Sequence, residues 1–411
     1  MKQADAVELP APSPAALQMI DRLIAMPTVS CDSNLGLIEF ARDHLARLGV
    51  KPQLVYDRRE RKASLFCTLA DNAAAARSRG VILAGHSDTV PVDRQDWSSD
   101  PFTATHRFDA GEGRIHGRGS ADMKGFIAVA LAWADRFLQT QQRLPVHLAL
   151  TYDEETTFAG VRGLVADLAE RGIRPAGCII GEPTDMRAVV AHKGKRDWCC
   201  RLRGREAHSS LTPDGVNAIE YAALLIGFIR DLAAQLERDG PQDARFAVPY
   251  STLQTGMIRG GVAVNVVPRD CEFWFEMRNL PGADASALVK RITDYAQHDL
   301  LPRMRRTAPE AEILFEPGME LEAFGIATEA AIVQWAMQLA GNRDLGAGAV
   351  SFATEASVFA AAGIPTVVMG PGSIEQAHKP DEYISYSQVA ACERFFERLL
   401  QARGVTETEA T

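Results

Sequence analysis

The amino-acid sequence predicts an α/β protein: a sandwich of helices around a largely parallel sheet, with a smaller α+β domain inserted into it. The chain has 411 residues, which are too many for one ordinary hydrophobic core. Helix and strand patterns alternate in both end regions of the chain, but this rhythm changes between residues 187 and 317. We therefore expect a discontinuous catalytic domain, residues 1–186 and 318–411, and an inserted domain, residues 187–317.

Apolar spacing predicts the elements of the discontinuous domain. Helical periods of apolar side chains occur at residues 15–26, 35–50, 124–139, 158–171, 329–341, 356–363 and 385–403. Short apolar runs predict strands at residues 62–70, 80–88, 144–152, 177–183 and 365–370. Strands that alternate with helices favour parallel pairing, and functional residues then gather beyond the carboxyl ends of the strands.

The inserted domain has the element order β-α-β-β-α-β. Its strands are expected at residues 188–204, 250–258, 271–279 and 311–317, and its helices at residues 215–236 and 285–301. This order is typical of a ferredoxin-like α+β domain.

Composition excludes several classes of protein. With 46% apolar and 24% charged residues, the chain is typical of soluble globular proteins. Its 44 Lys and Arg against 53 Asp and Glu give a net charge of −9, which argues against nucleic-acid binding. No stretch is long and apolar enough to span a membrane, and residues 1–14 lack the pattern of a signal peptide. Seven scattered cysteines suit a reducing cytoplasm, where we expect the protein to work.

Three adjacent acids, Asp153, Glu154 and Glu155, follow the predicted strand at residues 144–152. Such a triplet is either a solvated turn or a site at which a strong positive charge compensates the repulsion between carboxylates. Other side chains that can bind metals also lie at strand ends or in the loops between elements. They are His86, Asp88, Asp122, Glu182 and His378.

Each of these residues has a simpler explanation when it is taken alone; Asp122, for example, lies just before a helix and could be its N-cap. Together they supply two imidazoles and at least three carboxylates on loops that converge in an α/β fold. This mixed set suits two zinc-like cations about 3.5–4 Å apart. Asp88, two residues after His86, is well placed to accept the second ring proton of that imidazole.

The motifs that carry these residues resemble a known family. The segments AGHSDTVP, ADMKG, DEET, GEPTD and GPGSIEQAHKPDEY occur in the order found in the dinuclear zinc amidohydrolases, which include glutamate carboxypeptidase and aminoacylase. The similarity covers nearly the whole chain. Within this family, AHKG, HSS, GVNAIE and VPYSTL are most similar to the acetylornithine deacetylases. The resemblance implies hydrolysis of N2-acetyl-L-ornithine to L-ornithine and acetate in arginine biosynthesis.

The resemblance also implies a set of metal ligands. His86 and Glu182 would hold one zinc ion, Glu155 and His378 would hold the other, and Asp122 would bridge both. Cobalt is a possible substitute for zinc.

Glu154, next to a ligand, is implied as the general base. Successive side chains of extended backbone point in opposite directions, so Glu155 can face a metal while Glu154 faces the attacking water. We count Asp88 with the catalytic residues because of its expected contact with His86, whereas Asp153 is expected to be structural.

The inserted domain is implied to be a lid through which two copies of the chain form a homodimer. His208 would reach the partner subunit's active site and stabilise the tetrahedral oxyanion, and Arg278 would bind the substrate carboxylate through two hydrogen bonds. If the resemblance is set aside, the sequence predicts that His208 is a surface loop residue and that Arg278 is a salt-bridged strand residue. Asn265 is a weaker candidate for a substrate contact. Glu355 would meet a substrate amine, or it is merely an acid at a helix N-terminus.

Other functions remain open. A mononuclear iron oxygenase would use His86, Asp88 and His378, but this leaves most of the carboxylates without a role and conflicts with the α/β pattern. A metal-binding protein that has lost its chemistry is a second alternative, against which the acid at Glu154 argues. A succinyl-diaminopimelate desuccinylase, an N-acyl amino acid amidohydrolase or a dipeptidase of the same family would share the metal chemistry.

Overall fold

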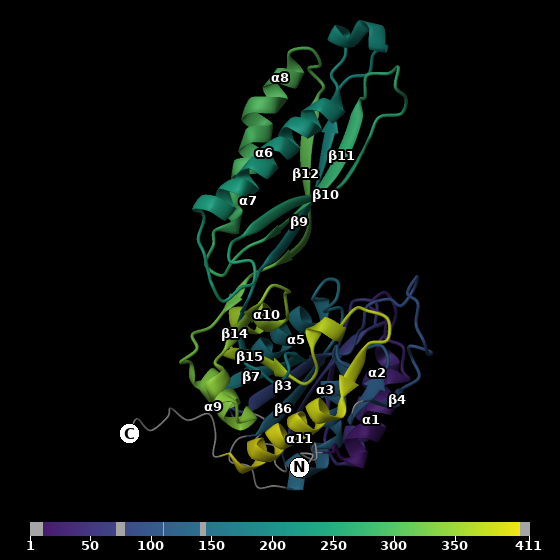
Figure 1. Cartoon of the computed structure of the whole chain (residues 1–411), viewed down its shortest axis with the longest axis vertical. Helices are drawn as coiled ribbons and strands as arrows, with labels where there is room; N and C mark the ends of the chain where they lie inside the picture. The colour runs from purple at the N-terminus through teal and green to yellow at the C-terminus, as the bar shows by residue number, and fades with distance from the viewer. Residues whose placement is uncertain (1–10, 71–78, 110, 140–144, 403–411) are drawn as a thin grey trace, which may run out of the picture. The chain divides into compact units, whose positions relative to one another are not determined.

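The computed structural model describes residues 11–70, 79–109, 111–139 and 145–402. Contacts divide the chain into two compact units, both visible in Figure 1. Unit 1 contains the described residues up to 190, residues 326–348 and those from 354 onward, and unit 2 contains residues 191–325 and 349–353. The first ten residues, on which the expectation about a signal peptide partly rests, lie outside the described residues.

Unit 1 is built on a mainly parallel sheet with the strand order β1-β2-β6-β3-β7-β15-β8. The neighbours β6, β3, β7 and β15 pair in parallel, whereas β1, β2 and β8 pair antiparallel. The bounds are β1 Gln53–Tyr56, β2 Ala63–Leu69, β3 Val81–His86, β6 Val146–Thr151, β7 Gly177–Pro183, β8 Val189–His192 and β15 Thr366–Gly370. The prediction of an α/β fold with a largely parallel sheet is confirmed.

The helices of unit 1 pack in groups against this sheet. Helix α3 contacts α1 and α11 and also lies against β3 and β7 (Figure 1), which explains why it is apolar on all sides. Helix α5 packs on β1, β2 and β6, and α10 packs on α5 and β15. The bounds are α1 Pro14–Ile24, α2 Leu35–Arg47, α3 Lys124–Ala132, α4 Ala134–Gln139, α5 Ala159–Glu170, α9 Ala331–Ala340, α10 Ala356–Ala361 and α11 Tyr386–Gln401.

A second, small sheet in unit 1 was not predicted. It has the strand order β16-β5-β4, with β4 Thr105–Asp109, β5 Glu112–His116 and β16 Tyr383–Ser385. β4 is largely exposed and polar, so it lacks the apolar run from which buried strands are recognised.

The strand predicted over residues 188–204 is divided into β8 and β9 Lys195–Arg203, which belong to different sheets. The division has a steric reason at Gly194. Its N–H donates to the carbonyl oxygen of Asn279 at 2.9 Å, and a Cβ at this position would lie 2.4 Å from Asn279 Oδ1. Only glycine allows two backbone segments to approach so closely.

Unit 2 contains an antiparallel sheet with the strand order β10-β11-β9-β12. The elements between and around these strands follow the predicted β-α-β-β-α-β order of a ferredoxin-like domain. The bounds are α6 Ala218–Asp239, β10 Thr252–Gly260, β11 Asp270–Arg278, α7 Ala285–Asp294, α8 Leu301–Arg305 and β12 Glu312–Leu321. A π-helical segment, Tyr295–Leu300, joins α7 to α8, and the short strands β13 Phe324–Gly325 and β14 Gly348–Val350 pair with β8.

Helix α6 illustrates how the sequence determines these elements. The side chain of Asn217 caps its first turn by accepting from Ile219 N at 3.0 Å and Glu220 N at 3.2 Å. Its buried residues recur every three or four positions and pack against β10 and β11. They are Ala218, Ala222, Leu225, Ile229, Leu232 and Leu236.

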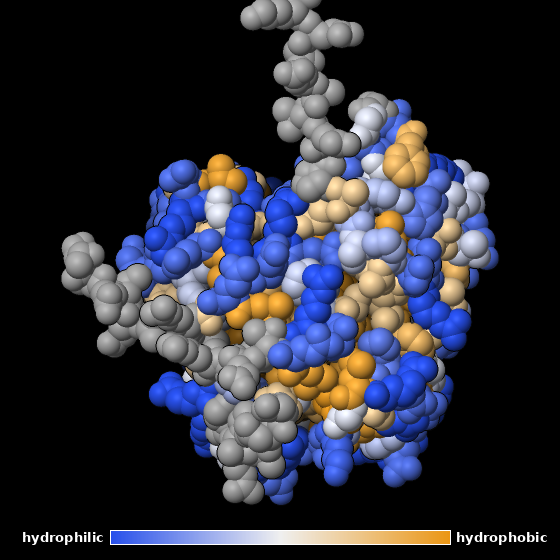
Figure 2. All heavy atoms as spheres, turned by 90° about the horizontal axis from the view of Figure 1, so that it is seen from below, coloured by the Kyte–Doolittle hydropathy of each residue, from blue (hydrophilic) through white to orange (hydrophobic). Residues whose placement is uncertain are grey.

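Among the described residues, no helix combines the length and the apolar character needed to cross a membrane. In the view of Figure 2, hydrophilic side chains cover much of the visible face, and hydrophobic side chains gather in a central region between them. This mixture is normal for folded proteins, whose surfaces retain many apolar atoms.

Helix α3 and strand β7 meet at Gly181. A Cβ at this position would lie 2.0 Å from the ring of Phe126, which is 2% exposed. The other side of that ring packs edge-on against Phe396 in α11 at a centroid distance of 5.8 Å. Gly181 therefore keeps α3 close to the sheet, immediately before Glu182 in the sequence.

Replacement Gly181→Ala should lower the free energy of unfolding by about 1–3 kcal/mol, because the new methyl group overpacks this contact. Gly36→Ala in α2 is the matched control, since no heavy atom lies within 4 Å of its Cβ position. This control should be neutral or stabilising by up to about 1 kcal/mol. Urea unfolding followed by tryptophan fluorescence measures both changes, and equal midpoints for the two variants would contradict the packing argument.

Candidate metal centre

The candidate ligands of unit 1 lie beyond the carboxyl ends of its parallel strands. His86 is the last residue of β3, and Glu182 lies near the end of β7. Glu154 and Glu155 follow β6, and His378 lies in the loop after β15. Parallel strands end at the same edge of a sheet, so this topology brings residues from distant parts of the sequence together.

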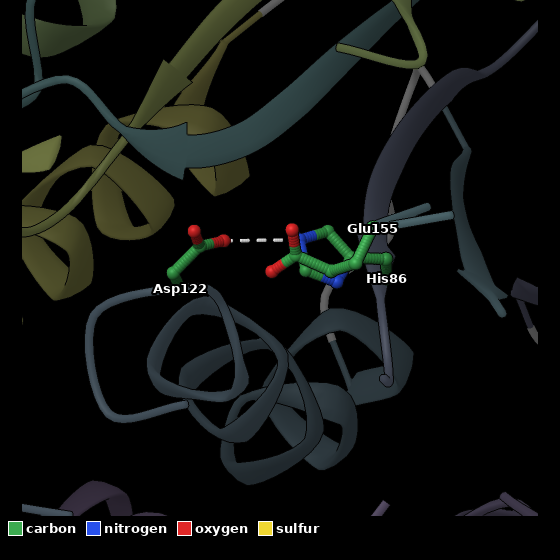
Figure 3. A group of neighbouring side chains, drawn as sticks. All are labelled: His86, Asp122 and Glu155. Atoms are coloured by element: carbon green, nitrogen blue, oxygen red, sulfur yellow. Dashed lines mark hydrogen bonds and ion pairs between the residues drawn. The ribbon is translucent and has the colours of Figure 1, made fainter. Parts of the chain in front are cut away.

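Asp122 lies between the two imidazoles. Its Oδ1 is 3.0 Å from Nε2 of His86, and its Oδ2 is 3.4 Å from Nε2 of His378. Figure 3 shows the first of these contacts together with Glu155. The structure assigns the N-cap of α3 to Met123, so Asp122 does not cap that helix. Each oxygen of this carboxylate thus faces a different imidazole.

The glutamates complete two overlapping groups that share His86. In the first group His86, Asp122 and Glu155 offer ligand atoms within 4.8 Å of one another, and in the second His86, Glu154 and Glu182 do so. His378 Nε2 is 3.1 Å from the Glu155 carboxylate, and His86 Nε2 is 3.8 Å from Glu182 Oε1. Glu154 therefore lies within ligand distance of this centre.

Asp88 organises this region differently from the expectation. Nδ1 of His86 is 3.0 Å from the main-chain carbonyl oxygen of Asp88 and 3.6 Å from its carboxylate. The carboxylate accepts from Ser30 Oγ at 2.7 Å and from the main-chain N–H groups of Glu154 at 3.2 Å and Glu155 at 3.4 Å. Asp88 thus orients His86 mainly through its backbone and fixes the acidic loop through its side chain.

The acidic triplet is divided between two environments. Asp153 adopts a left-handed backbone conformation, with φ 58°, and its carboxylate forms an ion pair with Lys62. Lys62 also donates to the carbonyl oxygen of Ser30. Asp153 is therefore paired away from the candidate ligands, and Glu154 and Glu155 remain with the centre.

Electrostatics show how crowded the centre is. Burial and the neighbouring acids raise the pKa of Glu182 well above its ordinary value, and burial raises the pKa of Glu154 in the same direction. Burial also opposes ionisation of Asp122, but contacts with His378 and His86 hold its pKa below the ordinary range. The contacts with Asp122 and Glu155 raise the pKa of His378 to about 10. The centre thus contains more carboxylates than the neighbouring imidazoles can neutralise.

These residues fit a divalent metal. Carboxylate oxygens and imidazole nitrogens from several loops converge within ligand distance, and most of them are buried. Buried carboxylates that repel one another are stabilised in their ionised form when a cation lies between them. Nitrogen and oxygen donors in this mixture are the ligands that zinc and related ions accept.

Glu355 lies behind the centre in unit 1. It is 1% exposed, and neither of its carboxylate oxygens has a hydrogen-bond partner among the described residues. Burial raises its pKa to about 7; the nearby Thr151 hydroxyl acts in the opposite direction, but it donates to the carbonyl oxygen of Gly85 rather than to Glu355. Glu355 occupies the N-cap position of α10 without a capping hydrogen bond from its side chain, so helix capping does not explain the buried acid.

The residues predicted to act from the lid lie in unit 2, at two separate places. Nδ1 of the exposed His208 is 2.8 Å from Ser210 Oγ, and the carbonyl oxygen of the exposed Asn265 accepts from Ser209 N at 3.0 Å. Arg278 lies at the opposite end of β11, where its Nε donates to Glu276 Oε1 at 2.9 Å. The structure brings His208 and Asn265 together but separates both from Arg278.

Three residues around the centre were not selected from the sequence. Glu382 and Gln95 contact the backbones of the candidate ligands Asp122 and His378, and Arg118 joins Glu382 to Gln95 through their side chains. Arg118 and Glu382 lie inside the motifs GRGSADMKG and EQAHKPDEY, so proximity to the ligands in sequence was the available signal.

Comparison with known proteins identifies the family. The model described as "Peptidase family M20/M25/M40" matches residues 82–402. The chain is 35% identical over 381 residues to an acetylornithine deacetylase of Pasteurella multocida strain Pm70 and 36% identical over 400 residues to one of Proteus mirabilis strain HI4320. These alignments cover 90% and 94% of this chain and 94% and 96% of the two relatives.

Solved structures share the fold. An aminopeptidase from Bacillus cereus ATCC 10987 aligns with a TM-score of 0.72 at 19% identity, over 94% of this chain and 97% of that one. An M20 family metallo-carboxypeptidase from Sulfolobus solfataricus aligns with a TM-score of 0.71 at 17% identity, over 95% of this chain and 100% of that one. Because the matched residues 82–402 include every candidate metal ligand, the chain belongs to peptidase family M20/M25/M40 and is a metal-dependent amidohydrolase.

Proposed function

We propose that the protein is a dinuclear zinc enzyme that hydrolyses N2-acetyl-L-ornithine to L-ornithine and acetate, a step of arginine biosynthesis. The observation that carries this proposal is the identity of 33–36% to acetylornithine deacetylases from several bacteria over at least 90% of the chain. Cobalt is a plausible replacement for zinc, because both ions accept nitrogen and oxygen donors. All seven cysteines are free, which supports a reducing cytoplasm as the site of action.

The proposed ligand assignment follows the geometry of Asp122. His86 and Glu182 hold one zinc ion, Glu155 and His378 hold the other, and Asp122 bridges both. Its two oxygens face different imidazoles, at 3.0 Å and 3.4 Å, and this arrangement supports a bridging role. When bound, the ions would polarise the amide carbonyl of the substrate and lower the pKa of the attacking water.

Glu154 is the proposed general base. Its backbone N–H is held by the Asp88 carboxylate, so the side chain projects from a fixed position. Its carboxylate would accept a proton from the attacking water, and the same carboxyl group would then pass that proton to the departing amine nitrogen. The separate pairing of Asp153 with Lys62 leaves this role to Glu154 alone within the triplet.

Two further residues are proposed to recognise the substrate. Arg278 binds the α-carboxylate, for which its planar guanidinium offers two parallel hydrogen bonds. That fork is paired with Glu276, so the substrate would replace an existing ion pair. Glu355 is the candidate partner of the distal amine, because its buried carboxylate has no hydrogen-bond partner of its own. Asn265 is a weaker candidate for a substrate contact.

The proposed homodimer would complete each site with His208 from the partner chain. Within one unit 2, His208 pairs with Val266, which precedes β11, whereas Arg278 is the last of the nine residues of that strand. At about 3.4 Å per residue, the two ends of β11 are roughly 27 Å apart, which is too far for one small substrate to touch both ends. Strand β10 is an edge of its sheet, with half-exposed Met257 and Ile258, and such an edge is suited to covering by another copy.

The division of labour between Glu154 and Glu155 can be tested by two isosteric changes. Glu154→Gln should keep two equivalents of zinc while kcat falls by about 10²–10⁴-fold, because the proton carrier is lost. Glu155→Gln should instead reduce the bound zinc toward one equivalent, because a ligand charge is lost. Elemental analysis of protein purified without chelator and steady-state kinetics measure these effects.

The reverse pattern would exchange the two assignments. A ceiling of one equivalent in the unaltered protein, together with an Asp122→Ala variant of unchanged metal content, would contradict the bridged pair of ions.

Trans-complementation tests the role of His208. Glu154→Gln and His208→Ala chains should each be nearly inactive, but a mixed dimer contains one intact site. Random exchange should therefore restore up to roughly a quarter of the unaltered activity. Subunit exchange is verified with two affinity tags; exchange without recovered activity would mean that His208 does not act across the dimer.

The substrate is tested by comparing kcat/KM for N2-acetylornithine, N-succinyl-diaminopimelate and a dipeptide with C-terminal glutamate. N2-acetylornithine should be preferred, and Arg278→Ala should raise its KM more than it lowers kcat, because an anchoring contact is removed. Small substrates such as N-acetylmethionine should also react, since a pocket discriminates weakly by side-chain size, but with a lower kcat/KM because they lack the amine proposed to meet Glu355. A tenfold advantage for either competitor would refute the deacetylase assignment.

A further inference from the structure

A chain of buried polar contacts links the loops that carry Asp122 and His378. It begins at Glu382, which is 1% exposed. One carboxylate oxygen of Glu382 accepts from the backbone N–H groups of Ala121 at 2.9 Å and Asp122 at 3.1 Å. Two hydrogen bonds to one oxygen fix the direction in which the main chain enters Asp122.

Arg118 extends this contact. Its Nη1 donates to the second oxygen of Glu382 at 2.7 Å, and its Nη2 donates to Gln95 Oε1 at 2.6 Å. The guanidinium is 1% exposed and lies 5.0 Å from the ring centre of Trp97. A planar fork can direct two bonds to two different loops, which a lysine ammonium at the same place could not do with the same geometry.

Gln95 completes the link. Its Nε2 donates to the carbonyl oxygen of His378 at 3.0 Å, while its Oε1 accepts from both Arg118 and the ring N–H of Trp97 at 3.1 Å. His378 adopts a left-handed backbone conformation, with φ 62°, which is uncommon for a residue other than glycine. Such a conformation persists where surrounding contacts hold it, and Gln95 supplies one of them.

We propose that Glu382, Arg118 and Gln95 are positioning residues that couple the two faces of the Asp122 bridge by holding the backbone of Asp122 and the backbone of His378 at a fixed separation. Within the described part of the chain, none of the three donates to a ligand side chain, so their effect is exerted through the main chain. The inference rests on the proposed metal centre and adds residues that the ligand set does not contain.

Two variants break the link at different points. Glu382→Gln keeps an oxygen for the N–H groups of Ala121 and Asp122 but turns an amide NH2 toward Arg118, so donor faces donor. Gln95→Ala removes the contact with the His378 carbonyl oxygen together with those to Arg118 and Trp97, at a partly exposed position that tolerates a small side chain. Gln53→Ala is the matched control, because Gln53 is exposed on β1 and distant in sequence from every ligand.

The full-length proteins are stripped of metal and titrated with Zn²⁺ in competition with a chromophoric chelator, and their thermal unfolding is followed without metal. Glu382→Gln should weaken zinc binding by about 10–100-fold, the usual effect of losing a group that orients a ligand. Gln95→Ala should weaken it less, by about 3–10-fold, since the bonds from the backbone N–H groups of Ala121 and Asp122 to Glu382 are kept. Gln53→Ala should bind zinc as the unaltered protein does.

The outcomes separate positioning from general stability. A merely structural role would lower the unfolding temperature of the metal-free variants and leave the zinc affinity of the folded protein unchanged; this result would overturn the inference. If Glu382→Gln does not fold, Gln95→Ala decides the question alone. If neither variant loses zinc affinity, the proposed metal centre stands and only the link is refuted. If the unaltered protein binds no zinc, both the metal centre and the link are refuted.

Discussion

The arrangement of unit 1 depends on the concentration of acidic and imidazole groups at one edge of a parallel sheet. Their burial is unfavourable unless positive charge is close by. The protein supplies part of that charge itself through Arg118, which is buried and paired with Glu382. Lys124 is also buried, but burial lowers its pKa to about 7 and so weakens its contribution. The remaining excess of carboxylates is the negative charge that a divalent metal would compensate.

Much of this centre could be predicted from sequence because each ligand lies close to a helix or strand that the apolar pattern predicts. His86 and Glu182 end apolar strands, and Asp122 precedes an apolar helix, so their convergence followed from the expected α/β topology. The family motifs added the order of the ligands. The structure confirms the fold class and the relationship to the family, and it places the predicted ligands next to one another.

Other features could not be predicted because they depend on backbone atoms. The acceptor of the second His86 proton is the Asp88 carbonyl oxygen, and every residue has one, so sequence favoured the carboxylate instead. Glu382 acts on main-chain N–H groups for the same reason. The break at Gly194 arises from the approach of Asn279, which is distant in sequence. Local periodicity contains no information about such contacts.

The position of β15 within its sheet affects the order in which the protein is assembled. β15 pairs in parallel with β7, although β7 ends at Pro183 and β15 begins only at Thr366, and both segments of unit 2 lie within this gap. On the ribosome, the sheet of unit 2 is therefore complete in sequence before β15 has been synthesised. Because β15 and the following loop that carries His378 are synthesised late, the nascent chain cannot complete the metal centre before then. Until then, β7 has an unpaired edge that is open to incorrect partners.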